Sequence, residues 1–508
     1  MAKNVVAGID IGTQGTKTAF FDEHGTVLSE TFEASQPSHG TEGSITEDPE
    51  KQLGSVINTL KNGLEKGGIE PSDVSGVAID SQMAGIIGVG SNGKNITPYD
   101  SWLDTRCAPF IKEMETEAGG EVLQKTGCAP SINHGPKKLW WKHNHPEVYR
   151  NITSFVQPGA YAAMRLTGKD GNEAFIDKTY LHFSGFADNA RSTWDEDLCR
   201  QFQFDTSKLP RIVEPHKVIG PVTCEMSALT GLQEGTPVVA GCGDTVASFI
   251  SAGATSRGVC VDVAGTASVF CATVDQFKAD TENAVLACGR SVIPELWYNY
   301  AYINGGGQNL EWFKDQISNI LPDSRESIDF PALNRLAEEA GFSIDNPVFI
   351  PHLGGRVCPS QPWLRGAWLN LNWSHGVGHL YRSLLEGIAL EYGIYLDITG
   401  KMHPELAMSE LNVVGGGTNS GLWNQIKADV LGINVTKLQR SKGAPMGSAI
   451  LAGYGVGLFN DIHDTVQQWI RREPALTPDP EKQKFYRKLI PKYSDFMDAI
   501  NRITENEY

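Results

Sequence analysis

An aspartate followed closely by glycines and threonines stands near the start of the chain. Asp10 ends an apolar stretch, and residues 12–16, which begin with Gly12 and Thr13, read Gly-Thr-Gln-Gly-Thr. Glycines let backbone N–H groups face one way in a tight turn, and threonine hydroxyls add donors, so the turn suits a phosphate group. The nearby carboxylate suits Mg²⁺, which takes oxygen ligands and keeps much of its water. A plain hairpin turn would also account for these residues.

A similar Gly-Thr turn occurs about half a chain later. Gly265 and Thr266 again follow an apolar stretch and precede another. Two such turns would close on one polyphosphate from opposite sides. The first turn lacks the lysine of the G-x-x-x-x-G-K-[ST] phosphate loop and does not match the dinucleotide pattern G-x-G-x-x-G.

A second aspartate has the surroundings of a general base. Asp244 follows a short apolar strand and the Gly-Cys-Gly turn at residues 241–243, and a helical stretch of small residues comes next. A carboxylate at a strand end can take the proton from a substrate hydroxyl, which is the role of the base in phosphoryl transfer. A simple N-cap aspartate fits the segment about as well.

Three further segments carry binding chemistry. Trp102, Asp104 and Arg106 combine an aromatic ring, a carboxylate and a guanidinium, a set that holds sugars but also fits a helix start with an ion pair. The glycine triplets 305–307 and 415–417 allow close approach to a base or ribose, although the second also fits a tight turn between strand and helix. Residues 443–453 indicate a closely packed helix of small residues with a structural role.

Composition excludes several classes of protein. The formal net charge of −17 argues against binding to nucleic acid or to an anionic membrane surface, although a local site can still take a small anion. Asp10 arrives before a secretory leader can form, and no uncharged apolar run reaches the ~18 residues of a membrane span. Nine scattered cysteines without a C-x-x-C pair predict reduced, mostly buried thiols and a cytoplasmic location.

The elements that must position these residues form two similar sets. Strands are predicted at residues 4–10, 16–22 and 26–33, a helix at 49–63 and a further strand at 74–80. A second hairpin is predicted from strands 259–263 and 269–274. The repeat predicts a duplicated α/β domain, residues 1–250 and 251–508, with a ligand cleft between the halves.

With these motifs in this order, the chain resembles the FGGY family of carbohydrate kinases over roughly residues 5–460. The two Gly-Thr turns resemble the family's phosphate turns, Trp102-x-Asp104-x-Arg106 its sugar motif, and Gly243-Asp244 its catalytic segment. A late block at residues 349–387 and the triplet 415–417, which resembles the adenosine turn, complete the series. The resemblance implies two ribonuclease-H-like domains of the actin and heat-shock chaperone superfamily, with ATP between them.

The resemblance also implies roles for individual residues. Asp244 would be the general base, and Asp10, together with Asp244, would hold Mg²⁺. The nucleotide and its phosphates would be bound by Gly12, Thr13, Gly265, Thr266, Gly307, Glu311, Gly416, Gly417 and Ser420. The sugar would be bound by Met83, Ala84, Trp102, Asp104, Arg106 and Thr245.

Within the family, the chain is most similar to the xylulokinase-like subgroup, but it departs where substrate is chosen. Xylulokinases tend to have Met-His where this chain has Met83-Ala84, and Asp-Asn where it has Asp244-Thr245. In the late block, Asn370 replaces a preferred Gly and Gly355 a frequent Glu. Loss of an imidazole at position 84 removes a hydrogen-bonding group and changes which sugar is accepted.

The prediction is therefore ATP-dependent phosphorylation of a hydroxyl on a small sugar, a ketopentose such as xylulose or a related ketose or polyol. The alternatives are another substrate of the family (ribulose, erythritol, gluconate or glycerol), a nucleotide-driven chaperone-like binding protein, and an inactive sugar sensor. Asp10 and Asp244 argue against the sensor, and the sugar motif argues against the chaperone. Members of the family are often dimers or tetramers, so the resemblance also allows a homodimer.

Overall fold

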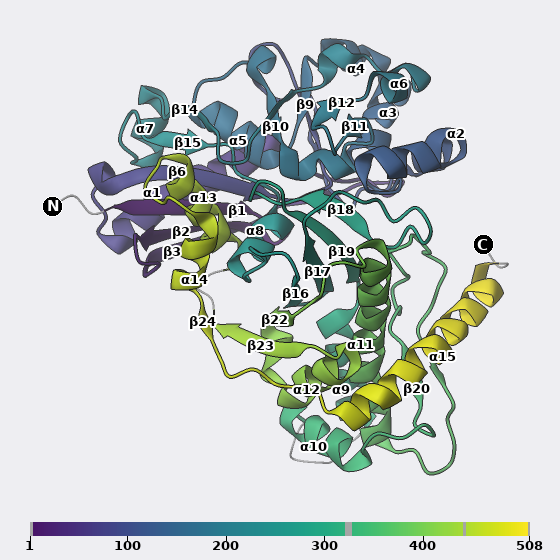
Figure 1. Ribbon diagram of the computed structural model, residues 1–508. Coiled ribbons are helices and arrows are strands. Elements are labelled where there is room, and N and C mark those ends of the chain that lie inside the picture. The colour runs from purple at the N-terminus through teal and green to yellow at the C-terminus, as the bar shows by residue number, and fades with distance from the viewer. Residues whose placement is uncertain (1–3, 321–327, 440–442, 506–508) are drawn as a thin grey trace.

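The computed structural model describes residues 4–320, 328–439 and 443–505. Figure 1 shows the first half of the chain, in purple and blue, above the green second half. Each half contains one mixed β-sheet with helices packed against it. The architecture is therefore the predicted α/β fold with two similar units.

The sheet of the first half has six strands in the order β14-β15-β6-β1-β2-β3. Strands β1, β2 and β3 are joined as antiparallel neighbours, whereas β6 runs parallel to β1 and β15 runs parallel to β6. All seven residues of β1 are buried, as expected of a central strand covered on both faces. The bounds are β1 (Val5–Ile11), β2 (Gly15–Asp22), β3 (Val27–Ala34), β6 (Val74–Ser81), β14 (Val218–Pro221) and β15 (Pro237–Val239).

The sheet of the second half has seven strands in the order β18-β19-β17-β16-β22-β23-β24. Its run β19-β17-β16-β22-β23 has the same order and strand directions as β3-β2-β1-β6-β15. This shared topology confirms the duplication predicted from the two hairpins. The bounds are β16 (Val259–Ala264), β17 (Ser268–Val274), β18 (Ala287–Arg290), β19 (Trp297–Ile303), β22 (Glu410–Val414), β23 (Asn434–Gln439) and β24 (Arg471–Arg472).

The helices of the first half cover its sheet and build a lobe beside it. Helix α1 has the end signals that the sequence shows: Asp48 caps its first turn, Pro49 follows, and Gly68 closes it at φ +56°. The bounds are α1 (Pro49–Gly67), α2 (Ala108–Thr126), α3 (His134–Asn144), α4 (Pro146–Asn151), α5 (Pro158–Leu166), α6 (Glu196–Gln201), α7 (Cys224–Thr230) and α8 (Asp244–Ser251). The short strands are β4 (Ser38–His39), β5 (Ile45–Glu47), β7 (Ile87–Val89), β8 (Tyr99–Asp100), β9 (Ser154–Val156), β10 (Phe175–Asp177), β11 (Ala187–Asp188), β12 (Thr193–Trp194) and β13 (Arg211–Val213).

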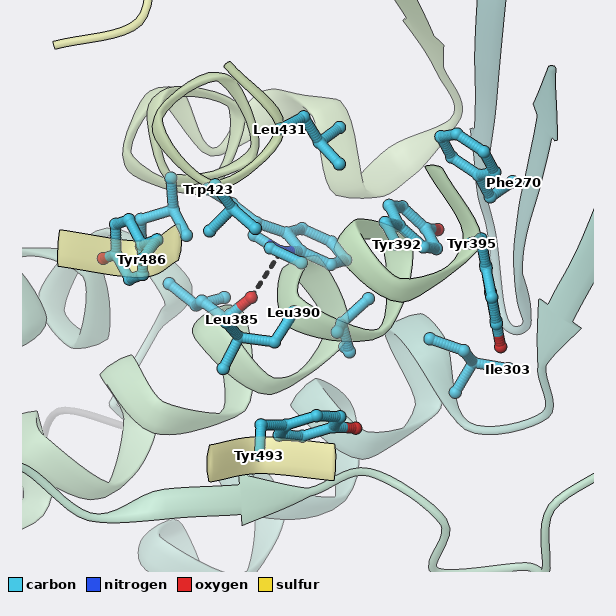
Figure 2. Packing of buried hydrophobic residues seen from close by; sticks show 14 of the residues in the cluster. Phe270, Ile303, Leu385, Leu390, Tyr392, Tyr395, Trp423, Leu431, Tyr486 and Tyr493 are labelled. Atoms are coloured by element: carbon cyan, nitrogen blue, oxygen red, sulfur yellow. Dashed lines mark hydrogen bonds between the residues drawn. The ribbon is translucent and has the colours of Figure 1, made fainter. Parts of the chain in front are cut away.

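The core of the second half is built around helix α11. Figure 2 shows the Trp423 indole among Leu385, Leu390 and Leu431, with its Nε1 donating to the carbonyl oxygen of Leu385 at 3.1 Å. Tyr486, from the C-terminal helix, closes one side of this core. The remaining bounds are α9 (Gly306–Ile320), α10 (Phe330–Ala340), β20 (Val348–Ile350), β21 (Ala367–Leu369), α11 (Val377–Met402), α12 (Gly421–Leu431), α14 (Ile462–Trp469) and α15 (Pro480–Glu505).

Helix α13 (Ala444–Gly455) lies late in the sequence but packs against β1 and β6 of the first sheet. A Cβ at Gly8 would come within 1.8 Å of the Pro445 carbonyl oxygen, and one at Gly447 within 2.2 Å of the Ala247 carbonyl oxygen. The predicted small-residue helix therefore packs as closely as its composition indicates. Because it crosses to the first sheet, the limits 1–250 and 251–508 stay a prediction.

One departure from the family pattern has a local explanation. Asn370 takes the place of a preferred glycine and adopts φ +63°, in the left-handed region that asparagine tolerates better than most side chains. Its Nδ2 also donates to the carbonyl oxygens of Asp345 (3.1 Å) and Asn346 (3.0 Å). Asn370 therefore keeps the turn and links it to the loop that precedes β20.

Two sequence expectations concern location. Across the residues that the structure describes, no helix combines the length and apolarity needed to cross a membrane. The nine cysteines are free thiols, and most are buried as predicted, with Cys224 exposed.

Candidate active site

Two aspartates from different elements face one cavity between the halves of the molecule. Asp10 lies near the end of β1 and Asp244 is the first residue of α8. The cavity measures about 270 Å³ and is also bounded by Val263 and Val269 of the second half. Its other lining residues are Gly12, Thr13, Gln14, Gly15, Lys17, Thr245, Ser248, Phe249 and Ala444.

The first Gly-Thr turn is held open toward this cavity by its backbone. Gly12 and Gly15 exchange N–H···O bonds of 3.1 and 3.3 Å. Gly15 adopts φ +153°, and a Cβ there would lie 2.2 Å from the Glu33 carbonyl oxygen, so only glycine fits. Thr13 is exposed, and its hydroxyl accepts a hydrogen bond from Trp102 Nε1 at 2.9 Å. The turn and part of the predicted sugar motif are therefore in direct contact.

A third carboxylate, Asp80, stands beside Asp10 because β1 and β6 pair these two residues in register. Burial raises the pKa of Asp10 to about 6, and Lys17 and a hydrogen bond with Asp80 act in the opposite direction. Burial and the neighbouring Asp10 charge raise the pKa of Asp80 well above its usual range. Asp80 Oδ2 accepts from Ser448 Oγ at 2.5 Å. The larger rise of the pKa at Asp80 means that Asp80 holds a proton more readily than Asp10 does.

Asp244 has the electrostatics of a base that works near neutral pH. Burial and the Asp10 charge raise its pKa to about 7, although hydrogen bonds from Thr245 favour the ionised form. These come from the Thr245 backbone N at 2.6 Å and its Oγ1 at 3.1 Å. The N-cap alternative is wrong by one position, because Gly243 caps α8 and Asp244 follows it.

Lys17 is a cavity residue that the sequence reasoning missed. The antiparallel register of β1 and β2 places it opposite Asp10, and both line the cavity. Directly opposed residues of a sheet share one face. The signal was present in the hairpin, since a lysine seven residues after an aspartate across this turn is its cross-strand partner.

Apart from Trp102, which contacts Thr13, the residues predicted to bind sugar fall into two groups. Met83 packs against the residue before the base: a Cβ on Gly243 would lie 1.8 Å from the Met83 sulfur. Ala84 follows it and is half-buried. Thr245 lines the cavity beside Asp244. Met83 and Thr245 therefore lie next to the predicted base, and Ala84 adjoins Met83 in the sequence.

Asp104 and Arg106 instead form a buried ion-pair network. Asp104 Oδ2 accepts from the Ile45 backbone N at 2.9 Å, and Arg106 Nε donates to both Asp104 oxygens. Arg106 also pairs with Asp100 at 2.7 Å and lies 4.2 Å from the centre of the Trp140 ring. This is the ion pair of the alternative interpretation, although the pair precedes α2 rather than starting it.

The second Gly-Thr turn opens onto a larger cavity of about 630 Å³. Helix α9 holds this turn: the Gly307 backbone N donates to Gly265 O at 3.0 Å, and Gln308 N donates to Thr266 O at 3.1 Å. All seven residues predicted for the nucleotide in the second half line the cavity: Gly265, Thr266, Gly307, Glu311, Gly416, Gly417 and Ser420. The structure therefore brings together residues that are spread from position 265 to position 420 of the chain.

The apolar walls of this cavity were not predicted. They include Phe330 and Pro331 of α10, Leu310, Tyr381 and Trp423. Side chains of these types are common in any core, so the sequence contains no local signal for them. A polar residue of α10, Asn334, also lines the cavity and was missed.

The side chains that could hold Mg²⁺ are few. Within the described parts of the chain, no three His, Cys, Asp or Glu side chains gather to hold a metal ion by themselves. Mg²⁺ commonly uses only one or two carboxylates together with water and substrate phosphates. Asp10 and Asp244, which line one cavity with the phosphate turn, fit that mode of binding.

The duplicated topology, with its cavities at the Gly-Thr turns, is that of the actin-like ATPase fold. Comparison with known proteins narrows this class. The N-terminal domain of the FGGY family of carbohydrate kinases matches residues 5–251 and its C-terminal domain matches residues 260–456. The chain belongs to the FGGY family of carbohydrate kinases, and it is an ATP-dependent sugar kinase that transfers phosphate to an alcohol group.

Individual relatives are distant but match nearly the whole chain. Xylulose kinase of Bacillus subtilis is 26% identical over 497 residues, 96% of each chain. Gluconokinase of the same organism is 26% identical over 510 residues, 99% of this chain and 96% of its own. The crystal structure of xylulose kinase from Rhodospirillum rubrum is similar with a TM-score of 0.89 and 26% identity, covering 99% of this chain and all of its own.

Proposed function

We propose that the enzyme transfers the γ-phosphoryl group of ATP to a hydroxyl of a ketopentose or a closely related ketose or polyol. The observation that carries the proposal is the cavity shared by Asp10, Asp244 and the first Gly-Thr turn. Phosphoryl transfer needs a base on the attacking hydroxyl and donors on the phosphate oxygens. This cavity has both groups within one enclosure.

In this proposal Asp244 accepts the proton of the attacking hydroxyl. Its raised pKa of about 7 suits a general base near neutral pH. Thr245, which bonds the carboxylate through backbone and hydroxyl, fixes the orientation of that carboxylate. Met83 and Ala84 form the neighbouring wall and select the sugar.

The phosphates would be held by both turns and by Lys17. Backbone N–H groups of the turns and the Lys17 ammonium oppose the triphosphate charge in a protein that is acidic overall. Mg²⁺, when bound by Asp10 and Asp244, would supply further charge neutralisation at the phosphate oxygens. The larger cavity lined by Gly416, Gly417 and Ser420 would take the nucleoside.

Xylulose is the first substrate to test and gluconate the second. Relatives named as xylulose kinase and gluconokinase are equally identical to this chain. Ala84 supports a departure from xylulose itself, because its methyl group offers no hydrogen bond to a sugar hydroxyl. A ketose and an aldonate differ in charge at one end, so a direct comparison separates them.

The test is a coupled assay of ADP formation with D-xylulose, D-ribulose, erythritol, glycerol and D-gluconate at equal concentrations. The proposal expects ADP formation that depends on one of the ketoses or polyols. Activity with gluconate alone would show that the substrate is an aldonate rather than a ketose or polyol, while the proposed phosphoryl transfer would stand. Slow hydrolysis that ignores every sugar would contradict the proposal and favour a chaperone-like protein.

A further inference from the structure

A short chain of hydrogen bonds fixes one amide at the wall of the larger cavity. Asn334 on α10 and Ser420, which precedes α12, both line this cavity. Ser420 Oγ accepts from the Trp423 backbone N at 3.2 Å, and its own hydrogen is directed to Asn334 Oδ1 at 3.1 Å. The Asn334 oxygen thereby uses one of its two lone pairs on Ser420, and the Nδ2 hydrogens are the donors that this side chain presents to an acceptor in the cavity.

The base of this chain of bonds is rigid. Trp423 is fully buried, and its indole Nε1 donates to Leu385 O at 3.1 Å within the core drawn in Figure 2. Ser420 caps α12, so its position follows that helix. Asn334 is therefore oriented before any ligand binds, which reduces the ordering cost of using it.

The cavity around Asn334 is one in which a single oriented donor can select the ligand. Phe330, Tyr381 and Trp423 give the cavity largely apolar walls of the kind that enclose a flat ring. In such pockets a few fixed polar groups decide which ligand fits. The N–H of an amide can donate to a ring nitrogen that carries a lone pair. It cannot pair in this way with the 6-amino group of adenine, which is itself a donor.

We infer that Asn334 is a specificity-determining residue that donates a hydrogen bond from Nδ2 to a ring nitrogen of the adenine of ATP. The inference rests on the proposed function, because that function assigns this cavity to the nucleoside. A purely structural role is the competing explanation: the Asn334–Ser420 bond would then only tie α10 to the start of α12.

Two substitutions separate these roles. Asn334→Asp keeps the oxygen that Ser420 bonds and the shape of the side chain, but it replaces the donor by an acceptor. Asn334→Leu removes both polar atoms at similar size. Glu338→Gln, at an exposed position one turn further along the same helix, is the matched control. Thermal unfolding of each variant checks that the fold is retained.

The measurement is calorimetric binding without sugar, so that turnover does not enter. Adenosine is the first probe, because it has no phosphate charge to repel the new aspartate. We expect Asn334→Asp and Asn334→Leu each to weaken adenosine binding about tenfold, the scale of one hydrogen bond in an enclosed site. Glu338→Gln should bind as the wild type does. Wild-type affinity in Asn334→Asp would overturn the inference and leave the structural role.

Ring-nitrogen analogues then test the bond itself. ATP is compared with its 1-deaza, 3-deaza and 7-deaza analogues in the wild type and in Asn334→Leu. One analogue should lose about tenfold in affinity for the wild type, and this loss should disappear in the variant. Equal losses in both proteins would overturn the inference. If the wild type binds neither ATP nor adenosine, the proposed function fails as well, and the two failures are thereby distinguished.

Discussion

The hairpins β1–β2 and β16–β17 occupy the same place in two sheets of the same topology, yet their aspartates have opposite surroundings. When Gly12-Thr13 is set on Gly265-Thr266, Asp10 corresponds to Val263, and Asp262 lies one residue earlier. Successive residues of a strand point to opposite faces. Asp10 and Val263 accordingly line the same cavity, whereas Asp262 points away into the core.

Asp262 is held by the interior of the second half. Its carboxylate pairs with Lys427 at 2.5 Å and accepts from Tyr392 OH at 2.8 Å, and both members of the ion pair are fully buried. The Lys427 ammonium also lies 3.8 Å from the centre of the Trp423 ring, below the larger cavity. A shift of one residue along a duplicated strand thus separates a carboxylate that faces a ligand cavity from one that joins two elements of a core.

The strongest test of this contrast removes the proposed base on the cavity side. Asp244→Asn should lower kcat roughly 10²- to 10⁴-fold, because general-base assistance is lost. ATP affinity and thermal stability should change little, since the amide keeps the shape of the carboxylate. Steady-state turnover and a melting curve check this. Turnover within a few-fold of the wild type would remove Asp244 from the proposed mechanism.

The next test compares the two hairpin aspartates directly. Asp262→Asn should cost about 3–5 kcal/mol of unfolding free energy, because it leaves the Lys427 charge buried without its partner. Asp10→Asn should lower turnover and leave stability nearly unchanged, because Asp10 faces the cavity. Denaturant unfolding of both variants is the measurement.

A double variant checks the physical reason for that loss. Asp262→Leu combined with Lys427→Met removes both charges and should recover much of the stability lost in Asp262→Asn. A double variant as unstable as the single one would show that packing or the Tyr392 bond, rather than the unpaired charge, sets the cost.

A smaller effect is expected from the contact between α9 and the second turn. Gly307→Ala would place a Cβ 2.4 Å from the Gly265 carbonyl oxygen, so the turn must shift away from the helix. We expect the KM for ATP to rise about tenfold, with a smaller change in the KM for sugar. An unchanged KM for ATP would show that this turn does not hold the nucleotide.

The smallest effect is expected at Gly416, whose Cβ would point into open space with no atom within 4 Å. Gly416→Ala should leave the melting temperature unchanged and weaken ATP binding a few-fold, because the methyl group takes volume from the cavity. Calorimetric titration with ATP measures this. Tighter or equal binding would place the nucleoside elsewhere in the cavity.

The fold was readable from the sequence where the signals are local. The strands of both hairpins were predicted to within about one residue, because apolar runs flanked by glycine turns define them. Helix α11 was missed because it is buried on nearly every side and lacks an amphipathic stripe. Helix α15 was not predicted either, because a proline inside it, Pro491, argues against a continuous helix.

In the candidate site, too, residues with a local motif were predicted and residues that depend on tertiary packing were not. The glycine triplets and Gly-Thr turns identified the nucleotide cavity because each motif has its own backbone signal. Asp80 was not identified, because its meaning depends on the parallel pairing of β6 with β1. Asn334 was missed for a similar reason, since only the placement of α10 beside α12 makes an ordinary asparagine part of a wall.

The path of α13 has a consequence for how the protein can be divided. The helix follows β23 of the second sheet in the sequence but packs between β1, β6 and α8 of the first half. A fragment that ends near residue 251 would expose an apolar groove on its sheet, and the complementary fragment would carry an unpaired helix with the same tendency to aggregate. Two such fragments should therefore be soluble only when they are produced together in one cell. The amount of soluble protein obtained from a gene split at this point would measure their reassembly.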